Sequence, residues 1–139
     1  MVMSIREIKR DEQLYAIVFS HSLRADGVRF LTPDSFTLQL GLIEHPSGKQ
    51  IRKHSHNPEI KYHVDTTQEF IYVEKGILEV TIYDCDWSEI TKFKLRPGDF
   101  YLHVSGGHGF KVIKKCRIFE IKQGPYPGDK IAKLFDSKE

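Results

Sequence analysis

The stretch that decides the fold lies at residues 69–83 and reads EFIYVEKGILEVTIY. Its second half alternates in hydropathy, so that Leu78, Val80 and Ile82 fall on one face of an extended chain. A period of two residues indicates a strand, because successive side chains of a strand point to opposite faces. The pair Lys75–Gly76 interrupts the pattern, which predicts that one strand ends near residue 74 and that a second begins at residue 77.

Short apolar runs of the same kind extend outward from this stretch in both directions. Turn signals such as Pro97-Gly98-Asp99 separate them, about every eight to twelve residues, a spacing typical of β-sandwiches and β-barrels. A helical pattern occurs only at residues 129–135, with Asp129 near its expected cap. We therefore predict a single all-β domain over residues 1–139 with a short C-terminal helix. Further strands are expected at residues 14–20, 28–32, 36–43, 50–56, 90–95, 100–104, 110–114 and 117–122.

The composition is that of a globular chain with little net charge. Lys and Arg number 21 against 19 Asp and Glu, a net charge of +2, which argues against a nucleic-acid partner because such proteins carry clustered basic faces. No apolar run approaches the ~20 residues that cross a bilayer, and residues 1–10 lack the apolar core of a secretory signal. We expect a cytoplasmic protein without a membrane partner, in which Cys85 and Cys116 are free thiols.

Two histidines in the expected strand 50–56 are the first candidates for chemistry. His54 and His56 stand two residues apart, so a strand would turn both side chains to the same face, within reach of one metal ion. A pair of this kind is also compatible with a purely structural role. Arg52 would share that face, where its guanidinium is suited to bind a carboxylate or phosphate group of a substrate, or to pair with Glu120.

One glutamate and one further histidine stand on faces that are otherwise apolar. Glu69 shares its strand face with Ile71 and Val73, and buried carboxylates are rare unless they are paired or bound to a metal. His108 begins a strand whose same face continues with Phe110. Two histidines on one strand, a glutamate on another and a histidine on a third would form a mixed nitrogen and oxygen site, suited to Zn, Fe, Mn, Ni or Co.

Together these segments resemble the two sequence motifs of the cupin family. The spacings G-x5-H-x-H, at residues 48–56, and E-x6-G, at residues 69–76, are similar to the first motif, and the P-G-D turn with the Gly-Gly-His of residues 106–108 is similar to the second. The resemblance implies a double-stranded β-helix, or jelly-roll barrel. It also implies a site for one divalent transition metal formed by His54, His56, Glu69 and His108. Twelve residues separate His56 from Glu69, which predicts an extended hairpin between them.

The resemblance leaves several functions open, because the fold hosts many. The leading hypothesis is a metal-dependent enzyme that acts on a small polar substrate, such as a sugar or a small organic acid, as an isomerase, epimerase or dioxygenase. Residues 120–130 resemble the ending of small bacterial cupins linked to sugar and nucleotide-sugar metabolism. One alternative is a metal-free nucleotide-sugar isomerase or epimerase with a histidine base and a tyrosine acid. Another is a non-enzymatic module that binds a small ligand.

The remaining expectations concern assembly and the other aromatic residues. Phe70 and Tyr72 give their strand a second apolar face, which predicts a homodimer that covers it. The strand at residues 14–20 would add to the sheet edge of the partner. His103 differs in parity from its apolar neighbours and is expected at the surface or in a satisfied contact, and Tyr101 is expected to have a structural role.

Overall fold

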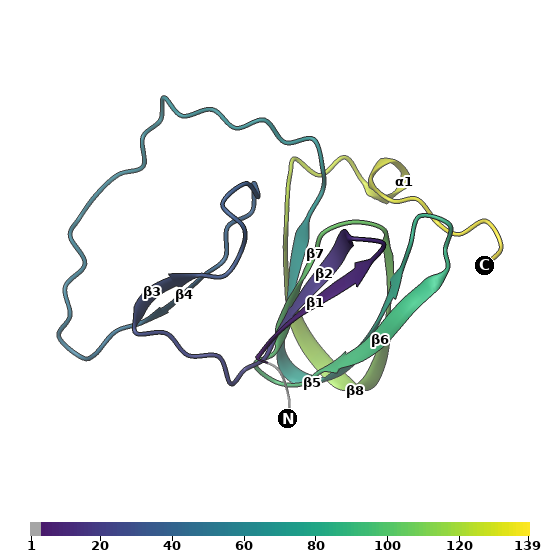
Figure 1. Ribbon diagram of the computed structural model, residues 1–139, viewed down its shortest axis with the longest axis horizontal. Helices are drawn as coiled ribbons and strands as arrows, with labels where there is room; N and C mark the ends of the chain where they lie inside the picture. Colours follow the sequence, from purple (N-terminus) through teal and green to yellow (C-terminus); the bar gives the residue numbers. More distant parts are fainter. Residues whose placement is uncertain (1–3) are drawn as a thin grey trace. The chain divides into compact units, whose positions relative to one another are not determined.

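The computed structural model describes residues 4–139, which divide into two compact units. The first combines the N-terminal residues up to Ser22 with Thr67–Glu139, and we name it the sheet unit. The second is Leu23–Thr66, the hairpin unit. Each unit has its own antiparallel sheet (Figure 1), so the all-β class is confirmed. No helix of the described residues is long and apolar enough to cross a membrane.

The sheet unit is a curled antiparallel half-barrel, compatible with a jelly roll, in which β5 is central (Figure 1). The beginning of β5 pairs with β7, its end pairs with β6, and β8 pairs with it over almost its whole length. The other edge of β8 pairs with no strand among the described residues. The elements of this unit are β1 (Ile5–Arg10), β2 (Gln13–Phe19), β5 (Glu69–Tyr83), β6 (Glu89–Leu95), β7 (Phe100–His103), β8 (Gly107–Lys122) and α1 (Asp129–Ala132).

The two longest strands continue where the sequence predicted breaks. β5 runs through Gly76, and β8 joins the segments expected separately at residues 110–114 and 117–122. The pairing between them shifts register around Lys75, which marks a β-bulge that bends the strands without ending them. Gly76 has a φ of 87°, and a side chain there would collide with the backbone of Lys115, so the bend requires glycine.

The predicted alternation in β5 forms the core. Leu78, Val80 and Ile82 are 0–1% exposed, and fully burying each such side chain stabilises the fold by roughly 1.5–3 kcal/mol. They pack in one cluster with residues from the neighbouring strands. The other members include Ile8, Tyr15, Ala16, Ile71, Val73, Phe93, Leu95 and Tyr101.

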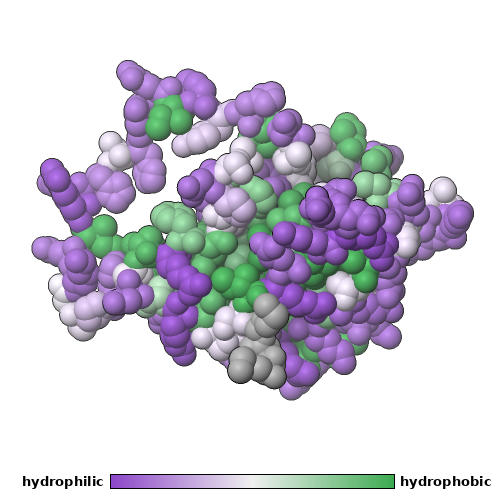
Figure 2. Space-filling model, viewed as in Figure 1, coloured by the Kyte–Doolittle hydropathy of each residue, from purple (hydrophilic) through white to green (hydrophobic). Residues whose placement is uncertain are grey.

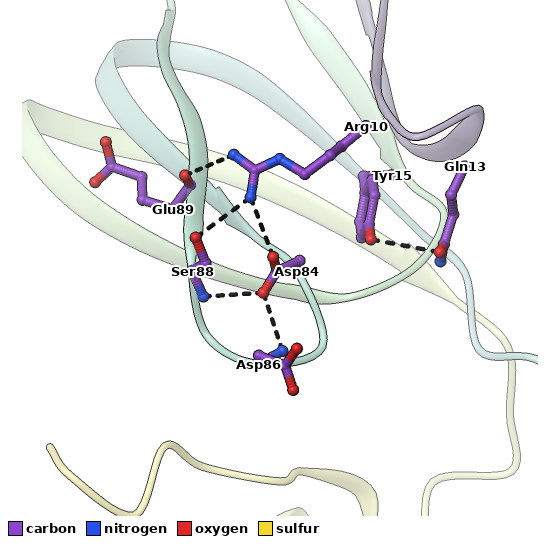
Figure 3. Close-up of polar contacts among 7 residues, drawn as sticks. All are labelled: Arg10, Gln13, Tyr15, Asp84, Asp86, Ser88 and Glu89. Atoms are coloured by element: carbon purple, nitrogen blue, oxygen red, sulfur yellow. Dashed lines mark hydrogen bonds and ion pairs between the residues drawn. The ribbon is translucent and has the colours of Figure 1, made fainter.

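Side chains tie β1, at one end of the strand order, to the turn that leads into β6. Arg10 donates hydrogen bonds to the Asp84 carboxylate (3.1 Å), the Ser88 hydroxyl (3.3 Å) and the Glu89 carbonyl (3.1 Å) (Figure 3). The Asp84 carboxylate also accepts the backbone N–H groups of Asp86 and Ser88. The hydrogen bonds to Ser88 and Asp86, followed by that from Arg10, lower the pKa of Asp84. These hydrogen bonds and the ion pair between Arg10 and Asp84 connect β1 to the turn before β6.

The hairpin unit pairs β3 (Gly27–Phe30) with β4 (Gly41–Glu44). The predicted strand at residues 36–43 is therefore wrong for its first part, and the predicted strand at residues 50–56 is absent. All residues from 45 to 66 are exposed and lack regular structure. A strand needs a neighbour for its backbone N–H and C=O groups, and no described strand pairs with this segment.

Two expectations at the ends of the sheet unit also change. The helix is confirmed but is shorter than predicted: it covers only Asp129–Ala132, and Gly128 rather than Asp129 is its cap. Ile131 is 75% exposed, so no apolar face is buried to extend the helix. The strand expected at residues 14–20 is no sheet edge, because β2 lies between β1 and β7.

Candidate functional site

The strand register gathers polar side chains on one face of the sheet unit. Glu69 pairs with His103 of β7 on one side and with Lys122 of β8 on the other. Two residues along, Ile71 pairs in the same way with Tyr101 and Glu120. Register partners share a face, and so do residues two apart in a strand. The five polar residues therefore belong to one patch, which His108 of β8 joins through its contacts.

A chain of hydrogen bonds connects three of these residues. The Tyr101 hydroxyl lies 2.5 Å from Nδ1 of His108, and Nε2 of His108 lies 3.1 Å from Oε1 of Glu69. Burial raises the pKa of Tyr101 well above its ordinary value, so the hydroxyl stays protonated. It therefore donates a hydrogen bond to Nδ1 of His108. Because Nδ1 then accepts, the neutral His108 ring carries its hydrogen on Nε2 and donates it to Glu69.

His108 is neutral in this arrangement. Burial, followed by the charge of His103, lowers the pKa of His108 to about 3. The rings of Tyr101, His103 and Phe110 lie around it, with centroid distances of 6.4, 4.1 and 4.8 Å. Its side chain is 23% exposed. The ring is thus held from several sides while one part of it still faces solvent.

Glu69 is a second group whose pKa the site shifts strongly. Burial, a hydrogen bond with Glu120 and the charge of Glu120 together raise the pKa of Glu69 to about 7. Its side chain is only 13% exposed, whereas Glu120 is more open and lies 3.3 Å from the ammonium group of Lys122. A carboxyl group of this kind can both accept and release a proton near neutral pH.

His103 is a functional candidate that sequence reasoning missed. It is 7% exposed and therefore not at the surface, one of the two positions expected for it, because β7 is buried on both faces. Its Nε2 lies 2.9 Å from the carbonyl oxygen of Gly106, and its Nδ1 has no hydrogen-bond partner among the described residues. What identifies His103 is its position directly opposite Glu69 in the pairing of β5 with β7. This register cannot be derived from the sequence pattern alone.

The four predicted metal ligands fall into two pairs. Glu69 and His108 are in contact in the sheet unit. His54 and His56 belong to the hairpin unit, where both are exposed and their ring centroids lie 5.4 Å apart. Within residues 4–139, no three His, Cys, Asp or Glu side chains are close enough to hold a metal ion. The convergence of the four on one ion stays a prediction.

Arg52 does not occupy the strand face from which its role was inferred, because residues 50–56 form no strand. It is exposed, and its carbonyl oxygen accepts a hydrogen bond from Nδ1 of His54 (2.8 Å). Glu120, its suggested ion-pair partner, is paired with Lys122. Cys85 and Cys116 are both free thiols.

Comparisons with protein-family models, with curated proteins and with solved structures gave no match for this chain. The resemblance to cupins therefore rests on the motifs themselves and on a curled β-sheet that is compatible with their barrel.

Proposed function

We propose that the sheet unit contains an acid–base site at which Glu69 moves a proton on a small polar molecule, as in an isomerase or epimerase. The observation that carries this proposal is the hydrogen-bonded chain from Tyr101 through His108 to Glu69. Such a chain orients one carboxyl oxygen and supplies a donor to it, which is the arrangement that general acid–base catalysis requires. The elevated pKa of Glu69 agrees with this role.

The roles differ from those of the metal-free alternative suggested by the sequence. Tyr101 is 0% exposed, so it cannot reach a ligand as an acid and instead holds the tautomer of His108. Both ring nitrogens of His108 are engaged, which leaves Glu69 to exchange the proton. When Glu69 is ionised, the Nε2 hydrogen of His108 stabilises the carboxylate, because hydrogen bonds to a charged group are stronger than neutral ones.

The substrate class follows from the surroundings of the chain. Phe110 packs its ring against His108 and is 44% exposed, and Val112, two residues further along β8, is 59% exposed. Glu120 and Lys122 add opposite charges nearby. An apolar wall beside acceptors and one ammonium group suits a compact molecule with hydroxyl groups and an apolar face. A sugar or a small hydroxy acid has this chemistry.

Hydrogen exchange at carbon tests the proposal directly. The full-length protein is incubated in D₂O with a panel of sugars, nucleotide sugars and small hydroxy acids, and deuterium entry is followed by NMR. We expect incorporation at one carbon next to a carbonyl, reduced at least about 100-fold in Glu69→Gln. Glu79→Gln, on the opposite face of the same strand, is the control. Equal incorporation by Glu69→Gln and wild type would refute the role of Glu69.

A metal centre is the second candidate. It is favoured by the contact between Glu69 and His108 and by the proximity of the His54 and His56 rings. The resemblance to cupins implies that these four side chains would hold one Zn, Fe, Mn, Ni or Co ion, which would supply Lewis-acid or oxygen chemistry to the same class of substrate. Metal analysis of untagged protein is expected to give about one ion per chain, which the His54→Ala variant loses and a His45→Ala variant keeps. Metal-free wild type would exclude a resident ion.

We also propose a homodimer formed through the outer face of β5 and β8. Tyr72 and Phe119 lie there with ring centroids 6.4 Å apart and are 41% and 49% exposed. On the face of the molecule drawn in Figure 2, hydrophobic residues also lie open among hydrophilic ones, so exposed apolar surface is not confined to this pair. Light scattering of the wild type at tens of micromolar, compared with Phe119→Glu, tests this. A wild-type monomer would refute the homodimer.

A further inference from the structure

We propose that His103 is a positioning residue that holds His108 in the orientation required by Glu69. Its importance for catalysis rests on the proposed acid–base function, whereas its effect on His108 is a separate physical claim. Three observations carry the proposal: the contact of the two rings, the hydrogen bond of His103 to the turn before β8, and the unpartnered ring nitrogen of His103.

The first observation is a direct contact. The rings of His103 and His108 are stacked, with centroids 4.1 Å apart and planes inclined by 25°. A ring in this position limits the rotation of His108 about its side-chain bonds. The limit matters because the hydrogen bonds of His108 to Tyr101 and to Glu69 use opposite edges of the same ring. A rotation that breaks one of them breaks both.

The second observation connects His103 to the backbone that carries His108. The Gly106 carbonyl oxygen can only accept, so Nε2 of His103 bears the hydrogen and donates it over 2.9 Å. Gly106 has a φ of 72°, and a side chain there would collide with the Tyr15 ring and the Tyr83 carbonyl. The turn therefore requires glycine at position 106, and His103 holds the turn by its hydrogen bond to Gly106. Gly106 stands two residues before His108.

The third observation separates this role from simple packing. Nδ1 of His103 is buried without a partner among residues 4–139, and an unsatisfied buried acceptor destabilises the folded state. A phenylalanine ring would fill the same space without that cost. Nδ1 of His103 therefore does not stabilise the core. What histidine provides here and phenylalanine cannot is the hydrogen bond from Nε2 to the turn. Such local conflicts with stability are expected at functional sites.

The test uses two variants that divide these contributions. His103→Phe keeps a ring against His108 but removes the donor to Gly106, whereas His103→Gln removes the ring but keeps an N–H donor. Nitrogen-15 NMR of the ligand-free, full-length protein reports which nitrogen of His108 carries the hydrogen. We expect one tautomer, protonated at Nε2, in the wild type and a mixture of tautomers in both variants, because His103→Gln loses the stacked ring and His103→Phe loses the hydrogen bond to the turn. The urea stability of His103→Phe is expected to equal or exceed that of the wild type. His63→Phe, in the exposed segment, is the matched control.

The outcomes are distinct. An unchanged His108 tautomer in folded His103→Phe would overturn the proposal, as would a wild-type His108 that is a tautomer mixture or is protonated at Nδ1, a result that needs no variant at all. For deuterium incorporation, we expect the kcat of His103→Phe to be about tenfold lower than that of the wild type, with little change in KM. This pattern is expected for a residue that does not bind the substrate. If Glu69→Gln were active while His103→Phe still disturbed His108, the acid–base function would fail and the positioning role would stand.

Discussion

Replacing Glu69 with glutamine will make the stability of the protein depend more strongly on pH. In the wild type, burial and the neighbouring Glu120 raise the pKa of Glu69 from 4.5 to about 7, so the folded protein keeps a proton that the unfolded chain releases. This contribution to stability is full below pH 4.5 and is lost as the pH rises through 7. Burial lowers the pKa of His108 from 6.5 to about 3, so the folded protein excludes a proton that the unfolded chain binds. That contribution is present at neutral pH and is lost as the pH falls.

The two effects nearly cancel between pH 5 and 7. Between pH 5 and 6, folded and unfolded wild type each bind about one proton at the pair, mostly on Glu69 when folded and mostly on His108 when unfolded, and at pH 7 both bind less. Glu69→Gln keeps only the effect of His108. At about 1.4 kcal/mol per pH unit where one proton is taken up on unfolding, lowering the pH from 7 to 5 costs this variant about 2 kcal/mol of stability. In His108→Gln only Glu69 remains, so the same acidification adds about 2 kcal/mol.

Urea denaturation at pH 5, 6 and 7 measures these differences. Other titrating groups contribute equally to wild type and variant, so the quantity compared is the change in the free energy of unfolding caused by the substitution. Glu79→Gln on the opposite strand face controls for the loss of one surface charge. Parallel profiles for wild type and Glu69→Gln would show that Glu69 is ionised in the folded protein like an ordinary carboxylate, and would refute the reasoning.

Three further perturbations test other parts of the structure. Tyr101→Phe leaves Nδ1 of His108 without its donor and is expected to lower the free energy of unfolding by about 1–3 kcal/mol, against little change for the exposed Tyr72→Phe, both measured in urea. Gly76→Ala forces a side chain into a backbone and a positive φ, so its melting temperature is expected to fall well below that of Gly128→Ala, where φ is also positive but the space is open; equal values would mean that the β5–β8 bulge adapts. Asp84→Asn removes a carboxylate whose pKa is lowered in the folded protein, so this carboxylate stabilises the fold at pH values above its ordinary pKa. The difference in free energy of unfolding between wild type and Asp84→Asn is therefore expected to become smaller as the pH falls from 5 to 3. A difference that does not change with pH would contradict the hydrogen bonds of Arg10 to Asp84.

The sequence was most informative where a single strand determines the answer. Alternation in residues 69–83 correctly predicted which side chains of β5 form the core, and the same parity placed Glu69 on the inner face. It failed at the ends of strands, since a bulge at Gly76 bends β5 where a turn was expected. It also failed for residues 50–56, because a strand exists only where another strand accepts its hydrogen bonds.

The candidate site was predicted only in part for a related reason. The motif spacing brought forward Glu69 and His108, which the structure places in contact. The sequence predicts a structural role for Tyr101 and a surface or satisfied position for His103, because parity within one strand does not show which residues of other strands lie beside it. Their importance comes from the cross-strand register that sets them beside β5 and from the turn at Gly106 that returns β8 to the site. Neither register nor the path of a turn can be read from periodicity.

The unpaired edge of β8 has a consequence for the behaviour of the protein in solution. This long strand exposes backbone donors and acceptors beside Phe110, Val112 and Ile113, a combination that templates the addition of strands from other molecules. Lys111, Lys114 and Lys115 interrupt the apolar run, and their mutual repulsion opposes the alignment of two such edges. We therefore expect these lysines to oppose fibril-like association through this edge. Acetylation, which removes these charges, or high salt, which screens them, is then expected to weaken the repulsion between two such edges.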